Sequence, residues 1–293
     1  FEKKDTPQKV NIKLFRQGPK DIRLNDTKIS QKELIGTLNT VIFCPEDLQL
    51  IKGTPSGRRR FLDMEISQTS ATYYHQLMQY NRLLQQRNAV LKEYRGKNTI
   101  PLEEWDLQLA DMASFIVKKR LESLKKINLL IDLMNRKLTG GLENLTIGYE
   151  QPYMDNGSLE YTKEGFYERI KAALPQDRHR LSTSVGPHRD DLRFFSDAMD
   201  LKKFGSQGQQ RTAVLSLKLS ELEFIKSEVG EYPVLLLDDV LSELDESRRT
   251  NLLQFIHKRI QTFITTTDIH DFKDLKSVQF ISCEGGQVQY GQP

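Results

Sequence analysis

The feature that most constrains the fold is the order of two short segments in the last third of the chain. Segment 205–211, with the sequence GSQGQQR, opens a long stretch of periodic apolar residues, and the apolar run 233–237 further on ends in Asp238 and Asp239. A glycine-bearing turn that opens a helix presents free backbone N–H groups and the positive dipole end to an anion. A buried strand that ends in two carboxylates suits Mg²⁺ and an attacking water. The pair therefore predicts phosphate chemistry on a framework of strands and helices.

Each segment alone has an ordinary explanation. Ser206 could simply cap a helix, because serine is a favoured N-cap and glycine-bearing turns are common. Two adjacent acids directly after a buried apolar strand, however, are costly near a core without a cation. Segment 242–245, Ser-Glu-Leu-Asp, follows at once. In this order the segments resemble the signature motif, Walker B strand and D-loop of an ABC-type ATPase head.

That resemblance implies a role for each residue of the two segments. Asp238 would hold Mg²⁺ through water, and Asp239 would be the catalytic base, in a position where such heads usually carry glutamate. Aspartate is one methylene shorter, so slow hydrolysis is expected. The residues expected to contact the ATP of a partner protomer are Ser206, Gln207, Gly208 and Gln209, and those expected in the D-loop are Ser242 and Asp245.

Thr267 stands where many ABC heads carry a switch histidine, at the end of a strand predicted over 262–267. A threonine can hydrogen-bond a phosphate but cannot take up a proton to become cationic. Asp268 follows it, and His270 is close in sequence. A nucleotide role for Thr267 therefore stays open.

The phosphate-binding loop of such heads, Gly-x-x-x-x-Gly-Lys-Ser/Thr, does not occur in the 293 residues. The nearest pair, Gly96-Lys97, has Leu91 in place of the first glycine and follows a helical pattern. The chain opens at Phe1 and runs directly into the alternating segment 10–15, typical of a half-buried strand. We expect the P-loop to lie upstream of Phe1, and the 293 residues alone to be inactive as an ATPase.

Composition limits the possible partners. The 43 basic and 40 acidic side chains give a net charge of +3, so a nucleic acid would have to be met by a local patch. Two cysteines, Cys44 and Cys283, suit neither a disulfide framework nor a zinc site. Cys44 lies in an apolar run, which favours a buried, inert thiol and a reducing cytoplasm. No apolar run approaches the roughly 20 residues of a membrane span, so no membrane partner is expected.

Periodicity divides the chain into three parts. Residues 1–54 read as strands and short turns, and 9–16 and 21–24 form an expected hairpin; another strand is expected over 40–44. Residues 55–180 are helical, whereas 181–293 alternate strands with helices, which implies a largely parallel sheet. The sequence thus predicts an α/β fold, an ABC-type head whose first lobe is formed by 1–54 and 181–293 and whose helical second lobe is inserted between them.

The helical part contains two long amphipathic helices. One follows the apolar face from Tyr73 to Leu91, and the other runs from Ala110 to Leu138 and stops at the glycines 140–141. We expect them to pack as an antiparallel hairpin rather than to form a ligand site. Further helices are expected over 163–174, 207–227 and 247–259, and further strands over 145–149, 191–195, 233–237, 278–282 and 287–290.

Two other clusters allow more than one interpretation. Arg58, Arg59 and Arg60 lie beside glycine-rich backbone, where they could grip DNA phosphates or form a solvated face. Segment 186–191, GPHRDD, superficially resembles a metal site but lacks a convincing ligand spacing. A structured loop with ion pairs is favoured there, although its arginine could also reach a nucleotide.

Taken together, the motifs resemble the RecF family of bacterial recombination mediators. The resemblance implies an SMC-like ATPase head that binds ATP and Mg²⁺, forms homodimers on ATP and hydrolyses ATP slowly, at a rate that DNA stimulates. It also implies binding to duplex or gapped DNA and cooperation with RecR and RecO to load RecA at gaps. The stretches that carry it, spread over nearly the whole chain, are 43–48, 58–63, 186–192, 204–211, 235–245 and 264–268.

Two other functions remain possible at this point. The ATPase subunit of a transporter shares the signature and Walker B segments, but the long helical insertion and the absence of glutamine from 45–48 stand against it. A non-catalytic module that binds DNA or a clamp, without any P-loop, would belong to a different class.

Overall fold

The computed structural model describes residues 1–3, 6–97, 101–141, 143–153, 161–267, 272 and 278–291. The amino-terminal residues form small antiparallel pairs. Strands β1 (Glu2–Lys3) and β2 (Thr6–Pro7) pair with each other, and β3 (Val10–Lys13), β4 (Asp21–Leu24) and β5 (Thr27–Lys28) form a three-stranded sheet followed by α1 (Gln31–Leu34). Val10 lies opposite Leu24, which confirms the expected hairpin.

A parallel sheet is formed by β6 (Thr40–Phe43), β10 (Val234–Asp238) and β11 (Thr262–Thr265), with β10, which ends at Asp238, in the middle. Its two faces differ. Val41 pairs with Leu235 on a buried face that belongs to the core. On the other face, Ile42 and Phe263 flank Leu236 and are 51% and 54% exposed. The predicted parallel strands are confirmed, and one face of this sheet is open.

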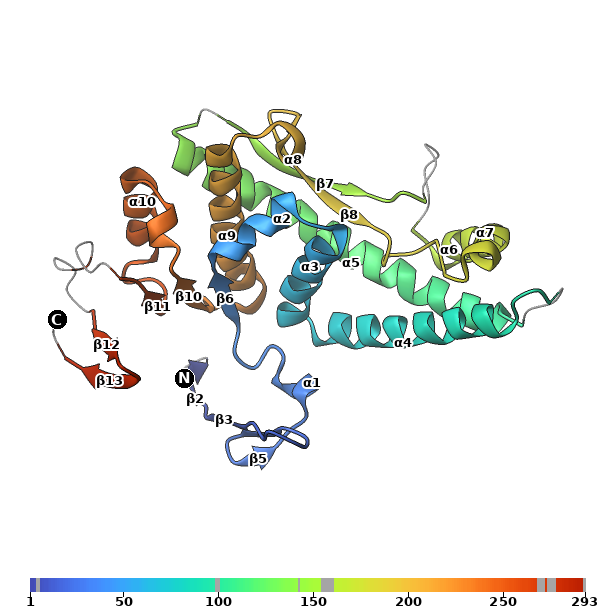
Figure 1. Cartoon of the computed structure of the whole chain (residues 1–293), viewed down its shortest axis with the longest axis horizontal. Coiled ribbons are helices and arrows are strands. Elements are labelled where there is room, and N and C mark those ends of the chain that lie inside the picture. Colours follow the sequence, from blue (N-terminus) through green and yellow to red (C-terminus); the bar gives the residue numbers. More distant parts are fainter. Residues whose placement is uncertain are drawn as a thin grey trace.

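The helical part begins with α2 (Gln49–Lys52), α3 (Pro55–Thr69), α4 (Ala71–Glu93) and α5 (Glu103–Thr139). The Ser70 side chain caps α4 by accepting from the N–H of Tyr73 at 3.2 Å. Helix α5 ends at Gly140, whose φ of 68° is the left-handed conformation that favours glycine. Figure 1 shows α4 lying alongside α5, and the expected hairpin of long helices is confirmed.

The strand expected over 191–195 does not join the parallel sheet. It is β8 (Asp191–Ser196), and it pairs antiparallel with β7 (Leu145–Glu150) and β9 (Met199–Asp200). Its side chains alternate between buried, as Leu192 and Phe194, and half-buried. Such alternation is typical of an antiparallel sheet with one covered face, whereas strands of parallel sheets are more continuously apolar. The largely parallel sheet that we predicted is therefore restricted to three strands.

The remaining elements follow the predicted order with one further correction. Pro175, read as the end of a helix over 163–174, instead lies in the first turn of a second helix, where its missing N–H is harmless. The elements are α6 (Lys163–Ala172), α7 (Leu174–Arg180), α8 (Leu201–Phe204), α9 (Gln207–Val229), α10 (Glu246–Ile256), β12 (Ile281–Glu284), β13 (Gln287–Tyr290) and the short 3₁₀ turns Pro45–Leu48 and Leu241–Glu243.

Helix α9 packs against both α5 and the parallel sheet, so a single core joins the two predicted lobes. The core runs from Leu235 of β10 through Leu215 of α9 to Ile127 of α5 and Phe166 of α6. Figure 1 shows the sheet and α10 at one end of the molecule, with α6, α7 and the ends of α4 and α5 at the other. The lobe boundaries after residues 54 and 180 remain predictions.

Arg120, halfway along α5, is 2% exposed and holds distant segments together. Its Nη2 lies 2.9 Å from Asp63 of α3, and its Nη1 donates to the carbonyl of Pro187 at 2.7 Å. The same Nη1 lies 3.5 Å from the fully buried Asp190. Burial alone would lower the pKa of Arg120, but Asp63 and the neighbouring tyrosines and Asp190 raise it above its ordinary value, so the group stays charged.

Replacing Arg120 with leucine should strongly destabilise the protein. The change leaves the Asp63 and Asp190 carboxylates without their cation, and breaking a buried pair in this way costs about 3–5 kcal/mol. Urea unfolding of both proteins measures the loss. The neighbouring Lys119→Ala is the control, because Lys119 pairs with exposed Glu122 and such surface pairs contribute about 1 kcal/mol or less. Equal unfolding midpoints for the two variants would contradict the role given to Arg120.

Candidate nucleotide site

The two carboxylates at the end of β10 are exposed and held by the neighbouring strand. Thr265 of β11 donates its hydroxyl to Asp238 Oδ1 at 2.7 Å and accepts from the N–H of Asp239 at 3.0 Å. Asp239 has a φ of 51°, a left-handed conformation that non-glycine residues adopt rarely. Strained backbone of this kind concentrates at functional sites. Thr265, absent from the sequence prediction, is thus the residue that positions both acids.

The D-loop residues lie directly after this edge. Ser242 donates its hydroxyl to the carbonyl of Asp239 at 2.8 Å and to its Oδ1 at 3.2 Å. Asp245 caps α10 by accepting from the N–H of Arg248 at 2.9 Å, and their side chains form an ion pair. Ser242 therefore orients the Asp239 carboxylate, while Asp245 fixes the start of the next helix.

The turn at Ser206–Gln209, here called the signature turn, opens α9 with a complete capping box. The Ser206 hydroxyl accepts from the N–H of Gln209 at 3.2 Å, and the Gln209 side chain accepts from the N–H of Ser206 at 3.0 Å. Gln209 also donates to Glu143 at 3.0 Å. Ser206 is thus an ordinary N-cap as well as a candidate phosphate contact.

Gly208 has no packing reason to be glycine. A Cβ at this position would meet only the Ser206 hydroxyl, at 3.9 Å, whereas a Cβ on Gly205 would clash with the carbonyl of Leu201 at 2.6 Å. Ser206, Gln207 and Gly208 are all exposed. The start of α9 therefore presents an open surface on which another molecule could approach the backbone closely.

Within the described part of the chain, no hydrogen bond or ion pair joins the signature turn to Asp238 or Asp239. The small cavity between the ends of β6 and β10 and the beginning of α9 measures about 40 Å³ and is too small for a nucleotide. One chain thus carries the two halves of the expected site without bringing them together.

Thr267 is exposed and lies beyond the end of β11. The threonine that contacts the carboxylates is Thr265, two residues earlier. Asp268 and His270 lie outside the described residues. A switch role for Thr267 therefore stays a prediction.

Comparison with known proteins agrees with these motifs. The chain is 47% identical over 270 residues to the DNA replication and repair protein RecF of Alkaliphilus oremlandii, covering 91% of this chain and 73% of that protein. It is 46% identical over 287 residues to RecF of Clostridium botulinum strain Eklund 17B, covering 97% of this chain and 78% of the relative. No family model matches the chain.

The chain belongs to the RecF family. Two solved structures, described as the recombination mediator protein RecF-ATPrS and RecF-ATP in the RecFOR pathway, superimpose with a TM-score of 0.87 at 36% identity. Each match covers 97% of this chain and 76% of the solved one. The mixed α/β fold of the described elements is therefore the RecF fold, and the transporter alternative is set aside.

The DNA expectation for Arg58 needs correction in this RecF-family chain. Arg58 is 4% exposed and forms two parallel hydrogen bonds of 2.8 Å with the carboxylate of Asp191. A buried, paired guanidinium is not available to a phosphate. Arg59 is half-buried and donates to the carbonyl of Asp190 at 2.7 Å, whereas Arg60 is exposed and none of the described carboxylates pairs with it.

The GPHRDD segment is a structured loop, as favoured from sequence. His188 Nδ1 lies 2.6 Å from the Tyr80 hydroxyl, and burial lowers the pKa of His188 to about 4, so the ring is neutral. The two acids pair with arginines, Asp190 with Arg120 and Asp191 with Arg58. Among the described residues, no group of three or more potential ligands could hold a metal. Within that same part of the chain, every helix is too short or too polar to cross a membrane.

Cys44 behaves as an inert thiol, although it is only partly buried. Burial and the nearby Asp47 raise the pKa of Cys44 to about 11. Its Sγ lies 3.7 Å from Asp47 Oδ2. The thiol is therefore protonated at neutral pH and a poor nucleophile.

A buried ion cluster in the middle of α9 was not predicted from the sequence. Lys218 lies 3.2 Å from Asp47, which follows β6, and 3.3 Å from Glu221 one turn along α9. Burial alone would lower the pKa of Lys218, but Glu221, Asp47 and Glu65 of α3 raise it. Burial in turn raises the pKa of Glu65 to about 7, against the opposing effect of Lys218. The helix that begins at the signature turn is thus tied by charge to β6 and α3.

Stability should depend on pH through Glu65. A carboxyl whose pKa is higher in the folded than in the unfolded state binds its proton more tightly in the folded protein. The stability that protonated Glu65 contributes is therefore complete below its ordinary pKa of 4.5 and is lost as the pH rises to about 7. Relative to Glu65→Gln, the wild type should lose up to about 3 kcal/mol of unfolding free energy over this interval.

Urea unfolding of the wild type and Glu65→Gln at several pH values between 4.5 and 8 measures the difference. The variant Glu122→Gln, at an exposed position of α5, serves as the control and should follow the wild type at every pH. A constant difference between the wild type and Glu65→Gln would show that Glu65 does not titrate in this range.

Proposed function

We propose that this chain is the larger part of the ATPase head of a recombination mediator that acts on DNA. The observation that carries the proposal is the pair of exposed acids Asp238 and Asp239, held by Thr265 at the sheet edge, in one chain with the open signature turn. The names of the relatives, DNA replication and repair protein RecF, and the RecF-ATP structure support it.

Asp238 and Asp239 fit a magnesium ion and an attacking water. Asp238 uses Oδ1 to accept from Thr265, which leaves Oδ2 open at the exposed edge. Mg²⁺ is usually held by one or two carboxylates together with waters and substrate phosphates. The ion would neutralise charge on the phosphates. Asp239, oriented by Ser242, would then accept a proton from water, with a reach shorter than that of glutamate.

The signature turn suits a phosphate carried by a second protomer. Within the described structure the Ser206 cap occupies the N–H of Gln209, and the N–H groups of Gln207 and Gly208 have no intrachain acceptor. These two donors at the positive end of α9 can bind the γ-phosphate. ATP would then join two protomers, and its hydrolysis would release them.

The D-loop and the switch position complete the proposed interface. Ser242 and Asp245 lie directly after the acids, where a partner could contact them, and Thr267 remains available on the exposed end after β11. Because the 293 residues contain no P-loop sequence, we propose that this chain alone binds ATP weakly and is inactive as an ATPase.

The cellular role that fits is loading of RecA at DNA gaps together with RecR and RecO. The solved relatives are described as mediators in the RecFOR pathway, which supports these partners. Slow, DNA-stimulated hydrolysis would set how long the ATP-bound dimer stays on DNA. The remaining alternative, a module that binds DNA without using ATP, predicts that ATP has no effect on dimers.

The variant Ser206→Arg in a full-length RecF with these residues should abolish ATP-dependent dimers while leaving ATP binding by the monomer nearly unchanged. The longer, charged side chain would occupy the space in which the partner's γ-phosphate is expected. Sedimentation with and without ATP measures dimers, and Gln86→Arg, at an exposed position of α4, is the control. Normal dimers in Ser206→Arg would contradict the role of the signature turn.

The two acids should give different defects. Asp239→Asn should keep Mg²⁺–ATP binding but slow hydrolysis by at least about 100-fold, because a general base contributes 10²–10⁴. Asp238→Asn should instead weaken binding that depends on Mg²⁺. Nucleotide titration with and without Mg²⁺, together with phosphate release, separates the two effects. Wild-type hydrolysis in both variants would refute the Walker B assignment.

DNA binding should depend on Arg60 and, to a smaller extent, on Arg59. Each lost phosphate contact lowers the slope of log affinity against log salt by roughly 0.9, and a dimer loses two contacts per substitution. Arg60→Ala should therefore weaken binding equally for unrelated duplexes and flatten the salt dependence. Titrations at several salt concentrations test this, with Lys28→Ala of β5 as the control. An unchanged slope for Arg60→Ala would indicate an ordinary solvated arginine.

A further inference from the structure

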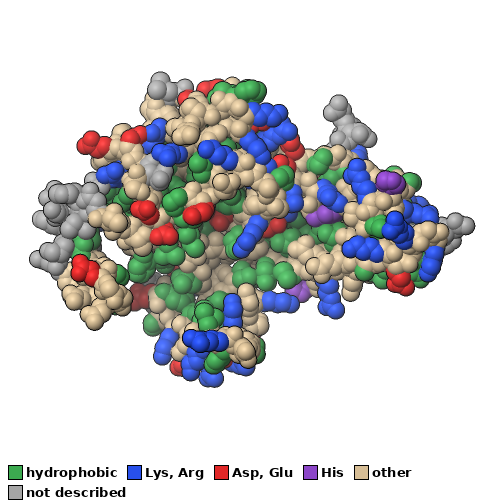
Figure 2. Space-filling view, viewed as in Figure 1, with side chains coloured by type: hydrophobic (Ala, Val, Ile, Leu, Met, Phe, Trp, Pro, Cys, Tyr) green, Lys and Arg blue, Asp and Glu red, His purple; other side chains and the backbone are tan. Residues whose placement is uncertain are grey.

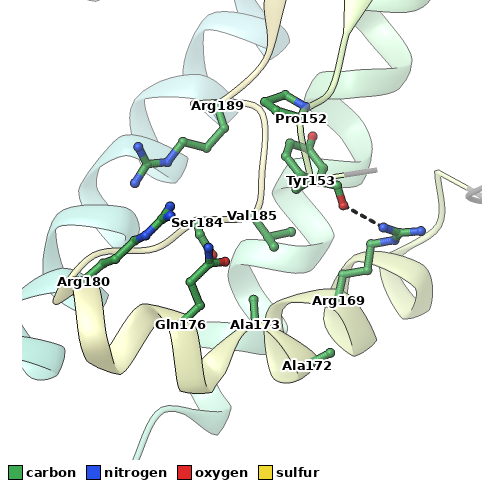
Figure 3. Close-up of a pocket in the computed structure, with 10 residues that line it drawn as sticks. All are labelled: Pro152, Tyr153, Arg169, Ala172, Ala173, Gln176, Arg180, Ser184, Val185 and Arg189. Atoms are coloured by element: carbon green, nitrogen blue, oxygen red, sulfur yellow. Dashed lines mark hydrogen bonds between the residues drawn. The ribbon is translucent and has the colours of Figure 1, made fainter. Parts of the chain in front are cut away.

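A cavity of about 340 Å³ lies between α6, α7 and the loop 184–189, at the end of the molecule opposite the parallel sheet (Figures 1 and 3). Its size is at the lower end of the range for small-molecule sites. Tyr153 and Arg169 border one side, and Gln176, Arg180, Ser184 and Arg189 border the other (Figure 3). The phosphate motifs lie on other elements, so this cavity is not part of the proposed ATP site.

The wall of the cavity is strongly positive. Arg169, Arg180 and Arg189 all line it, and no acidic residue does so among the described residues. Two acids that neighbour lining residues in sequence pair with other arginines: Asp177 lies 2.6 Å from the buried Arg87, and Asp190 pairs with Arg120. Figure 2 shows further Lys and Arg side chains gathered over this end of the molecule. In the part of the chain that the structure describes, no carboxylate forms an ion pair with any of the three guanidinium groups.

Backbone and side-chain acceptors hold the arginines in place. Arg169 donates to the carbonyl of Tyr153 at 2.7 Å, and Arg189 donates twice to the carbonyl of Thr183, at 3.0 and 2.7 Å. The Gln176 amide is assigned with its nitrogen donating to Ser184 Oγ at 3.2 Å. In this orientation its oxygen accepts from both Nη atoms of Arg180, at 3.2 and 3.3 Å. Each of these acceptors is neutral. They orient the arginines but do not compensate their positive charge.

The composition of the cavity favours phosphate over carboxylate. A carboxylate carries one charge, whereas a phosphate monoester carries nearly two and has three strong acceptor oxygens. Guanidinium groups match phosphate oxygens through paired N–H donors. The floor is apolar, formed by Ala173 and Val185, and leaves room for a carbon group next to the phosphate.

We propose that this cavity binds a phosphate group carrying nearly two negative charges, either free phosphate or the phosphate of a nucleotide, at a second site separate from the ATP site. The proposal does not depend on the proposed ATPase cycle, because it uses none of the residues assigned to that cycle. Its chemical basis is three oriented arginines around an apolar floor.

Calorimetric titration of the 293-residue chain with inorganic phosphate, adenosine 5′-monophosphate and acetate tests the proposal. Phosphate and the nucleotide should bind, and acetate should bind at least about tenfold more weakly because it offers one charge and two oxygens. Tighter binding of the nucleotide than of free phosphate would indicate that the floor holds the attached group. Acetate binding as tight as that of phosphate, or no binding of either phosphate, would overturn the proposal.

Two variants locate the site. Arg180→Gln should weaken phosphate binding about tenfold or more, since a hydrogen bond to a charged group is lost. Lys171→Gln is the matched control, because Lys171 carries the same charge at an exposed position of α6 but does not line the cavity. Equal affinities in these two variants would place phosphate elsewhere.

Ala172→Glu provides a second test that keeps all three arginines. Ala172 is exposed on the cavity wall, so the change should leave the fold intact, as circular dichroism can verify. The new carboxylate should pair with the arginines and reduce phosphate binding at least tenfold. Unchanged phosphate binding by folded Ala172→Glu would contradict the site.

Discussion

The buried guanidinium of Arg120 is the interaction on which the rest of the fold depends. It joins α5 to Asp63 of α3 and to Asp190, which directly precedes β8. The neighbouring Asp191 binds Arg58 at the start of α3. Since a charge at this depth is stable only with its partners, the loop 186–191 has one position relative to the helices. The antiparallel sheet and the helical hairpin are thereby fixed together, and α9 packs on α5 beside them.

The sequence predicted well what local rules decide. Helix α5 and its stop at Gly140, the cap at Ser206 and the apolar strand before Asp238 all follow from periodicity, capping and turn chemistry within a few residues. Strand pairing was predicted less well. The segment that became β8 could join either sheet by spacing alone, and its partner β7 lies in the part of the chain expected to be helical.

The candidate site divides in the same way. Asp238, Asp239 and Ser206 were predictable because their motifs are continuous in sequence. Thr265 was not, because its contact with the acids depends on the register between β10 and β11. The burial of Arg58 was also out of reach: its partner Asp191 lies 133 residues away, and a run of three arginines looks the same whether or not one of them is buried.

Helix α9 connects the candidate site to the core of the protein. Its first residues form the signature turn. Its middle carries Lys218, which pairs with Asp47 after β6 and interacts electrostatically with Glu65 of α3. A buried ion cluster resists small displacements, because separating the charges exposes each to a low-dielectric surrounding without its partner. Helix α9 therefore cannot shift on engaging a partner without also moving β6 and α3 or breaking this cluster. The open signature turn and the buried cluster at Lys218 thus belong to one continuous helix.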